Sequence, residues 1–283
     1  MDKHYTFFDD DGRSFFVNKN ITSKELENLR LTYLEKQDSA FFSFLYEQKP
    51  FPYKYKYYRF FAFANIENTI HKNTIIEFIE SLVGHLDVLY LKGQVVLFFP
   101  NNPDIELKNI FASISDDFAI SFKGFESMPL NSSYPEDFSI LFSSYLQNHH
   151  ATSGCFLPCD LVFDIEKKDY SLLKPLRQVI LREIIKDSQL ENLINVFFMN
   201  NLNISKTAKL VYMHRNTIMN KLDTIKKSTS FNIQNFHEAV AMYMLLKAKW
   251  CAMCPLKKVK IISIIRLVIK RRICYGYSNI KKH

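Results

Sequence analysis

The sequence predicts an α+β protein in which a module of mixed strands and helices precedes an all-α C-terminal part. Apolar runs and helical periods alternate between residues 57 and 125, whereas residues 168–248 show helical spacing only. Hydrophobic residues make up 47% of the 283 residues, which is too many for an intrinsically disordered chain. These patterns divide the chain into residues 1–48, 49–166, 167–248 and 249–283.

The first segment, residues 1–48, is predicted to be mainly helical. A short polar-aromatic stretch leads into apolar residues at positions 26, 29, 33 and 34, which fit a helical period. The segment ends at Lys49-Pro50-Phe51-Pro52, because proline interrupts a helix.

The second segment, residues 49–166, is predicted to fold as an α/β module. Its strands and helices follow the order β-α-β-β-α-β, at residues 57–64, 66–83, 87–91, 94–99, 105–118 and 119–125. The two middle strands flank Lys92-Gly93, a hairpin turn. This order is typical of a split βαβ arrangement, an antiparallel sheet with helices on one face. Residues 135–146 and a short strand at 161–163 are expected to follow.

The third segment, residues 167–248, is predicted to contain five helices, at residues 171–185, 189–200, 204–212, 215–227 and 235–247. Asn203 or Ser205 can cap the third of them. The turn from Tyr212 to His214 is short and contains no proline, so the third and fourth helices form a helix-turn-helix.

The fourth helix has two different sides. Ile218, Leu222 and Ile225 are spaced to lie on one side, which leaves Asn216, Asn220 and Lys227 on the other. Arg215, Asn216 and Thr217 lie at its N-terminal end, where a recognition helix meets base edges in the major groove. Arginine can pair with guanine and asparagine with adenine, and Lys206, Lys209, Lys221 and Lys226 suit phosphate contacts.

The basic charge of the chain is local. The net charge is +8, but residues 1–200 sum to −7, residues 201–248 to +5 and residues 249–283 to +10. Positive charge attracts nucleic acid phosphates. The +5 that coincides with the helix pair therefore supports DNA binding, whereas the body of the chain is acidic.

The residues of the helix pair carry a family resemblance. Ser-x-Thr-Ala-x-Leu from Ser205, followed by His-Arg-Asn-Thr-Ile-x-x-Lys-Leu-x-x-Ile from His214, resembles the C-terminal helix-turn-helix of PucR-type and sugar-diacid (CdaR-type) transcriptional regulators. The resemblance covers residues 188–248 and departs at Asn220-Lys221, where family members often carry Tyr-Arg. It implies a bacterial, cytoplasmic regulator that binds double-stranded DNA as a homodimer and responds to a small-molecule effector.

Residue chemistry and this resemblance together predict a set of DNA-contacting residues. They are Ser205, Lys206, Thr207, His214, Arg215, Asn216, Thr217, Asn220, Lys221 and Lys227. The rival hypothesis is an interaction protein whose helical C-terminus only dimerises.

The same resemblance suggests a degenerate GGDEF-like cyclase module upstream, because family members often carry one and the β-α-β-β-α-β order is similar. A working cyclase needs acidic residues to hold magnesium. The hairpin turn reads Leu91-Lys92-Gly93-Gln94-Val95, and residues 60–64 contain no carboxylate. We therefore expect no enzyme activity and no cofactor, and either ligand sensing or dimerisation as the role of the module.

A metal site is the remaining route to an enzyme. His149, His150, Cys155 and Cys159 could ligate zinc, but their spacing matches no standard finger and cysteine is often a small buried residue. We therefore predict no metal site. We also expect no membrane span, because no run of about 18 apolar residues occurs, and a cytosolic location, because the N-terminus lacks the apolar stretch of a signal peptide.

The tail, residues 249–283, is basic and contains no acidic residue. It is interpretable as a DNA-binding or membrane-surface arm, as a poorly ordered extension, or as out-of-frame translation. The abrupt change in composition after Lys247 favours the last two.

Overall fold

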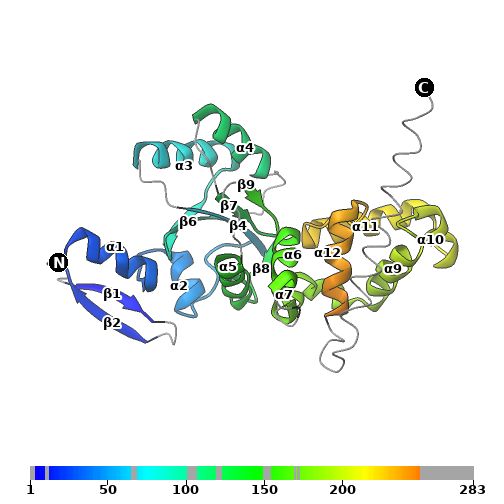
Figure 1. Cartoon of the computed structure of the whole chain (residues 1–283), viewed down its shortest axis with the longest axis horizontal. Coiled ribbons are helices and arrows are strands. Elements are labelled where there is room, and N and C mark those ends of the chain that lie inside the picture. The colour runs from blue at the N-terminus through cyan, green and yellow to red at the C-terminus, as the bar shows by residue number, and fades with distance from the viewer. Residues whose placement is uncertain are drawn as a thin grey trace.

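The computed structural model describes residues 4–9, 13–64, 69–100, 107–118, 123–148, 154–168, 170 and 173–248. A small N-terminal sheet lies at one end, a larger sheet lies in the centre, and the C-terminal helices lie at the other end (Figure 1). The protein is thus of mixed α+β class, as predicted. The tail at 249–283 and the residues His149 and His150 lie outside the described residues.

The N-terminal segment contains a sheet that the sequence analysis missed. Its strands β1 (His4–Phe8), β2 (Ser14–Asn18) and β3 (Leu34–Glu35) pair antiparallel in the order β2-β1-β3. Two helices, α1 (Ser23–Thr32) and α2 (Ala40–Tyr46), complete the segment. The prediction of a mainly helical segment was therefore incomplete, because the aromatic residues of β1 and β2 gain their stability from cross-strand partners such as Phe7 and Phe15.

The central sheet confirms the predicted order of elements. Strands β4 (Tyr57–Ala64), β5 (Asp87–Leu91), β6 (Gln94–Phe99) and β7 (Lys123–Glu126) alternate with the helices α3 (Thr69–Val83) and α4 (Leu107–Phe118). The strand order is β5-β6-β4-β7, and β6 lies antiparallel between β4 and β5, as in a split βαβ unit. Two further strands extend it: β8 (Leu130–Asn131) pairs with β4, and β9 (Gly154–Phe156) lies parallel to β7.

The hairpin turn between β5 and β6 has the predicted residues in the predicted place. Lys92 and Gly93 both have positive φ angles, of 47° and 72°, which suit the twist of a two-residue hairpin. Glycine adopts this conformation without steric cost. The turn therefore determines the register in which Leu91 lies opposite Gln94.

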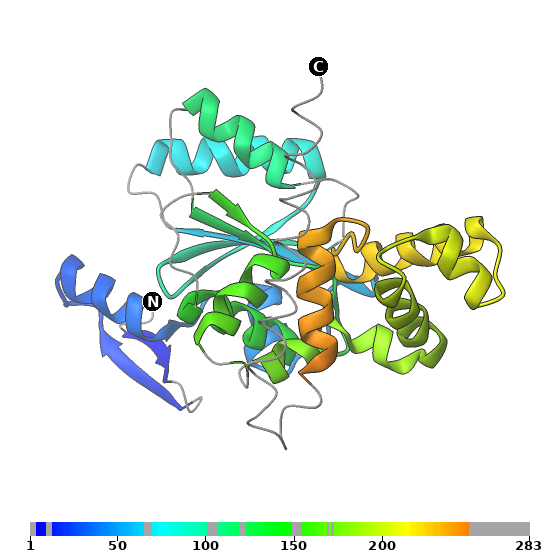
Figure 2. The same cartoon turned by 45° about the vertical axis from the view of Figure 1, so that its right-hand side comes forward.

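Both faces of the central sheet are covered, whereas the order of elements predicted helices on one face. Phe61 and Phe63 pack with Phe111 of α4 on one face, and Phe60 packs on Phe138 of the helix α5 (Glu136–Asn148) on the other. Figure 2 shows α3 and α4 on one side of the sheet and helices that include α5 on the other. The reason is that β4 is apolar at consecutive positions, which suits burial on both sides.

The predicted strand at residues 161–163 is wrong, because these residues lie in helix α6 (Pro158–Lys168). Proline is favourable at a first helical position, and the Asp160 side chain accepts a hydrogen bond of 3.0 Å from the Leu157 backbone N–H. Leu161 and Ile165 are buried one helical turn apart. The predicted boundary at residues 166/167 falls inside this helix.

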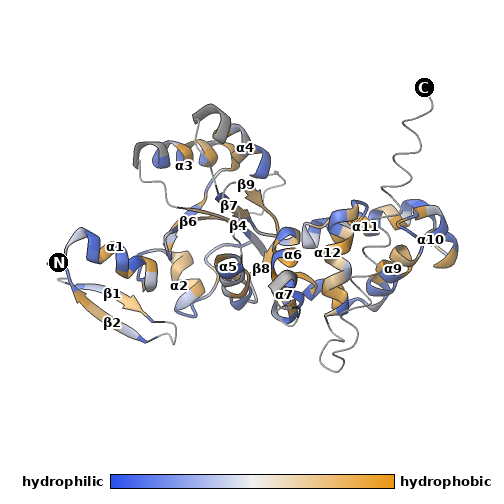
Figure 3. Ribbon diagram, viewed as in Figure 1, coloured by the Kyte–Doolittle hydropathy of each residue, from blue (hydrophilic) through white to orange (hydrophobic). Residues whose placement is uncertain are grey.

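The C-terminal part is helical throughout its described residues: α7 (Leu173–Ile180), α8 (Arg182–Lys186), α9 (Ser188–Met199), α10 (Ile204–Leu210), α11 (Arg215–Thr229) and α12 (Phe236–Lys247). The helix predicted at 171–185 is two helices, α7 and α8, separated at Leu181. Helix α12 packs against α6 and α7, and the Tyr170 hydroxyl donates to the Met244 carbonyl at 2.9 Å. Helix α11 carries both hydrophobic and hydrophilic residues, whereas α12 is mostly hydrophobic (Figure 3). Among the described residues, no helix combines the length and the apolar character that a membrane span requires.

Candidate nucleic-acid interface

The helix pair begins at Asn203. The Asn203 side chain accepts a hydrogen bond of 2.9 Å from the Lys206 backbone N–H and so caps α10, which decides between the two predicted capping residues. Ala208 is buried where α10 packs in the core of the domain, and a small side chain there allows the helices to approach closely.

A tight turn joins α10 to α11. The Met213 backbone N–H donates to the Ala208 carbonyl at 3.0 Å, and the Val211 N–H donates to Thr207 at 3.0 Å. The intervening Tyr212 has a φ of 53°, in the left-handed region. This pattern is a Schellman-type helix end, in which glycine usually occupies the left-handed position. A tyrosine there stores strain in the backbone.

His214 begins the helix α11. Its Nδ1 accepts a hydrogen bond of 3.3 Å from the Asn216 backbone N–H, so this histidine is the N-cap. Ile218, Leu222 and Ile225 are buried, as the helical spacing predicted. The helix is therefore held by its apolar side, and its opposite side faces outward.

The outward side of α11 carries most of the predicted DNA-contacting residues. Exposed on α11 and its cap are His214, Arg215, Asn216, Thr217, Asn220 and Lys227, whereas Lys221 is half-buried. Ser205 and Lys206 are exposed on α10. The pair thus places Arg215 and Asn216 at the accessible start of a helix whose other side is packed in the core.

Thr207 is the exception among the predicted residues. Its side chain is fully buried, so the predicted DNA contact is wrong for this residue. Helical spacing explains the error, because Thr207 lies beside Ala208 on the packed side of α10. Its hydroxyl has no hydrogen-bond partner among the described residues.

The surface of the helix pair is positively charged. Lys206, Lys209, Arg215, Lys226 and Lys227 are exposed, and in the described part of the chain none of them forms an ion pair. Cations without an acidic partner are available to neutralise phosphates.

Tyr212 is a surface residue that the sequence analysis did not select. Its side chain is 95% exposed, two residues before the N-cap His214 of α11. One feature of the sequence points to this tyrosine. It is an aromatic residue at the turn position that glycine would occupy without strain.

A cleft of about 280 Å³ lies where the α/β module meets the far end of α11. Its lining includes Asn131 and Asp137 from the module, Arg182 from α8, and Thr224 and Lys227 from α11. Arg182 donates through Nε to Asp137 at 2.8 Å and also pairs with it through Nη2. Burial raises the pKa of the Asp137 carboxyl, against the lowering effect of this ion pair.

A short capped helix, a tight turn and a second helix with an accessible polar start define a helix-turn-helix domain. Residues 190–248 match the family model of the PucR C-terminal helix-turn-helix domain. This part of the chain is therefore a helix-turn-helix similar to the PucR C-terminal domain, and the match supports a DNA-binding transcription regulator.

The solved structures that resemble the chain include a regulator of polyketide synthase expression from Bifidobacterium adolescentis. It is 11% identical, and the similarity covers 70% of this chain and 82% of that chain with a TM-score of 0.31. No curated protein matches the chain.

Proposed function

We propose that the protein is a sequence-specific transcriptional regulator that inserts α11 into the major groove of double-stranded DNA. The observation that carries this proposal is the exposed start of α11, where Arg215 and Asn216 stand beside cations that have no acidic partner in the described residues. Side chains at the N-terminal end of a recognition helix contact base edges in this docking geometry.

The exposed residues divide into two roles. Arg215 is suited to bidentate pairing with guanine, Asn216 to pairing with adenine, and Thr217 and Asn220 continue the same accessible side. Phosphate contacts come from Ser205, Lys206, His214, Lys221 and Lys227, which set register and affinity. Tyr212 joins the second group, because tyrosine hydroxyls also bind phosphate oxygens.

We further propose that the protein acts as a homodimer on a two-fold-related operator. Helix-turn-helix dimers place their recognition helices one DNA turn apart, about 34 Å. Sedimentation velocity of the full chain, alone and on an operator with two half-sites, tests this arrangement.

The α/β module is proposed to sense a ligand without catalysing a reaction. The cleft between the module and α11 supports sensing, because a molecule bound there would contact both the module and the recognition helix. Thr224 is exposed on α11 and lines the cleft, so Thr224→Trp should block it while the core is retained. In a thermal-shift screen with small carboxylic acids and phosphate esters, a compound that stabilises the wild type should not stabilise this variant.

Genomic footprinting of the expressed protein tests the main proposal, because it reports binding and identifies the regulated genes. Affinity for a footprinted site should fall steeply with salt concentration, since bound phosphates release counterions. A protein that only dimerises through apolar contacts would show no such dependence. A chain truncated after Ala248 should still bind the operator, and loss of binding in it would assign the DNA interface to residues 249–283 instead.

A further inference from the structure

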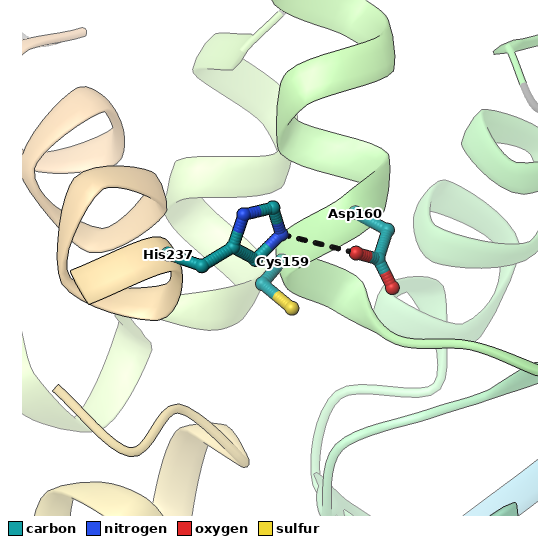
Figure 4. A group of neighbouring side chains, drawn as sticks. All are labelled: Cys159, Asp160 and His237. Carbon is teal, nitrogen blue, oxygen red and sulfur yellow. Dashed lines mark hydrogen bonds and ion pairs between the residues drawn. The ribbon is translucent and has the colours of Figure 1, made fainter. Parts of the chain in front are cut away.

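Three potential metal ligands lie close together beside the helix-turn-helix domain, on two helices that are far apart in the sequence. Cys159 and Asp160 lie in the first turn of α6, and His237 lies in the first turn of α12. The Cys159 sulfur, a carboxylate oxygen of Asp160 and a ring nitrogen of His237 all lie within 4.8 Å of one another. The His237 ring and the Asp160 carboxylate point toward each other, and Cys159 lies beside them (Figure 4).

We propose that Cys159, Asp160 and His237 bind one zinc ion. Thiolate, imidazole and carboxylate are the ligands that Zn²⁺ takes in proteins. Nε2 of His237 lies 3.2 Å from Oδ1 of Asp160, close to the separation of about 3.3 Å between two ligands that each bind zinc at about 2.0 Å in a tetrahedron. Of the four residues that the sequence offered as zinc ligands, this site uses Cys159.

Each ligand is already oriented by a second contact. The other carboxylate oxygen of Asp160, Oδ2, accepts the Leu157 backbone N–H at 3.0 Å, which leaves Oδ1 for the metal. The Phe163 ring lies 4.5 Å from the His237 ring, centroid to centroid, and supports it on one face. Cys159 is 3% exposed and is held by packing in the core. Such surrounding contacts orient ligands and increase metal affinity.

The charge and the access of the site also suit a divalent cation. On binding, the Cys159 thiol releases its proton to solvent as the Zn–S bond forms, and the hydrogen bond between Asp160 and His237 is replaced by their bonds to zinc. One thiolate, one carboxylate and one neutral imidazole then balance the 2+ charge. The side chains of His237 and Asp160 are 55% and 34% exposed, so water can enter and take the fourth position.

The ion would join the two halves of the protein. Helix α6 follows the last strand of the central sheet, and α12 closes the helix-turn-helix domain and packs against α6. Bound zinc is therefore expected to stabilise the docking of the DNA-binding domain on the α/β module. This inference does not depend on DNA recognition by α11.

Cobalt titration of the full chain tests the site. The tail contains Cys251, Cys254 and Cys274, so the background protein carries Cys→Ser changes at these three positions. We expect one equivalent of Co²⁺ to give a thiolate-to-metal charge-transfer band and tetrahedral d–d bands, both removed by added Zn²⁺. Zinc should also raise the Tm of this protein.

Matched variants decide the assignment. Cys159→Ser should remove the charge-transfer band. His237→Ala should weaken zinc binding by more than about 100-fold, which exceeds the loss expected when only a residue that contacts a ligand is changed. Cys155 lies outside the cluster, so Cys155→Ser should leave the affinity for zinc unchanged. If the Cys159→Ser protein fails to fold, the zinc affinity of His237→Ala provides the test, because His237 is half-exposed and its replacement should leave the core intact. No saturable cobalt band, or equal affinity in His237→Ala and the background protein, would overturn the proposal.

Discussion

The imidazole of His214 and the backbone of Asn216 form the contact that starts the recognition helix: His214 Nδ1 accepts the Asn216 N–H at 3.3 Å. The first backbone N–H groups of a helix have no partner within the helix, and a capping side chain satisfies one of them. The residue that caps α11 therefore holds in place the residue proposed to read adenine. Helix stability and base recognition are coupled at this position.

His214→Ala should lower the free energy of unfolding by about 1 kcal/mol, because it removes this cap. His214→Asn supplies another capping side chain and should recover most of the loss. Chemical denaturation of the two variants and the wild type measures the difference. Equal stability of the alanine and asparagine variants would show that the cap contributes nothing.

Arg215→Ala and Asn216→Ala should each weaken binding to the operator by about 1–3 kcal/mol while binding to unrelated DNA changes little. Lys206→Ala is the control, because loss of a phosphate contact should weaken binding to all sequences alike and reduce the salt slope by about 1. Gel shifts with specific and unrelated duplexes separate these effects. Unchanged discrimination by Arg215→Ala would refute α11 as the recognition helix.

Tyr212→Gly should raise the free energy of unfolding by about 1 kcal/mol, because glycine adopts the left-handed φ of 53° without strain. The same variant should bind DNA more weakly if the exposed tyrosine contacts a phosphate. Tyr212→Phe keeps the strained backbone and removes only the hydroxyl, so it should match the wild type in stability and the glycine variant in affinity. A glycine variant less stable than the wild type would contradict the strain argument.

Thr207→Val should raise the free energy of unfolding by about 1 kcal/mol, because a buried hydroxyl without a partner in the described structure is replaced by a methyl group of similar shape. Operator affinity should stay the same, since the side chain is buried. Thr207→Ser, which keeps the hydroxyl and loses the methyl group, should be less stable than the wild type. Thermal and chemical unfolding of the three proteins provide the comparison.

Glu47 gives a pH dependence to stability. Lys36 at 2.8 Å, Lys49 at 3.0 Å and the Ser43 hydroxyl at 2.9 Å lower the pKa of its carboxyl from 4.5 to about 2. A carboxyl with a lowered pKa in the folded state stabilises the protein above its ordinary pKa. That stability is lost as pH falls from about 4.5 to about 2.

Glu47→Gln should therefore be less stable than the wild type at neutral pH, and the difference should disappear as the pH falls below about 2. The difference at pH 7 should be at most about 1 kcal/mol, because the contacts lie near the surface and are screened by water and salt. Added salt should reduce it further. A difference that stays constant with pH would rule out the ion pairs as its source.

Sequence patterns predicted the elements whose structure is determined by neighbouring residues. The hairpin at Lys92-Gly93 follows from a turn that glycine permits, and the apolar side of α11 follows from the spacing of Ile218, Leu222 and Ile225. Residues 161–163 were misassigned because a short apolar run suits either a strand or a buried helix. The capping contact of Asp160 and the packing around α6 select the helix.

The sequence by itself determined the β-α-β-β-α-β order, the helix-turn-helix and the local positive charge, since these depend on neighbouring residues, turn chemistry and composition. Only the tertiary structure decided that both faces of the sheet are covered, that Thr207 is buried, and that Asp160 meets His237 across 77 residues of chain. Such contacts depend on how separate elements pack. These contacts depend on all the elements of the core together, so the periodicity of one segment cannot predict them.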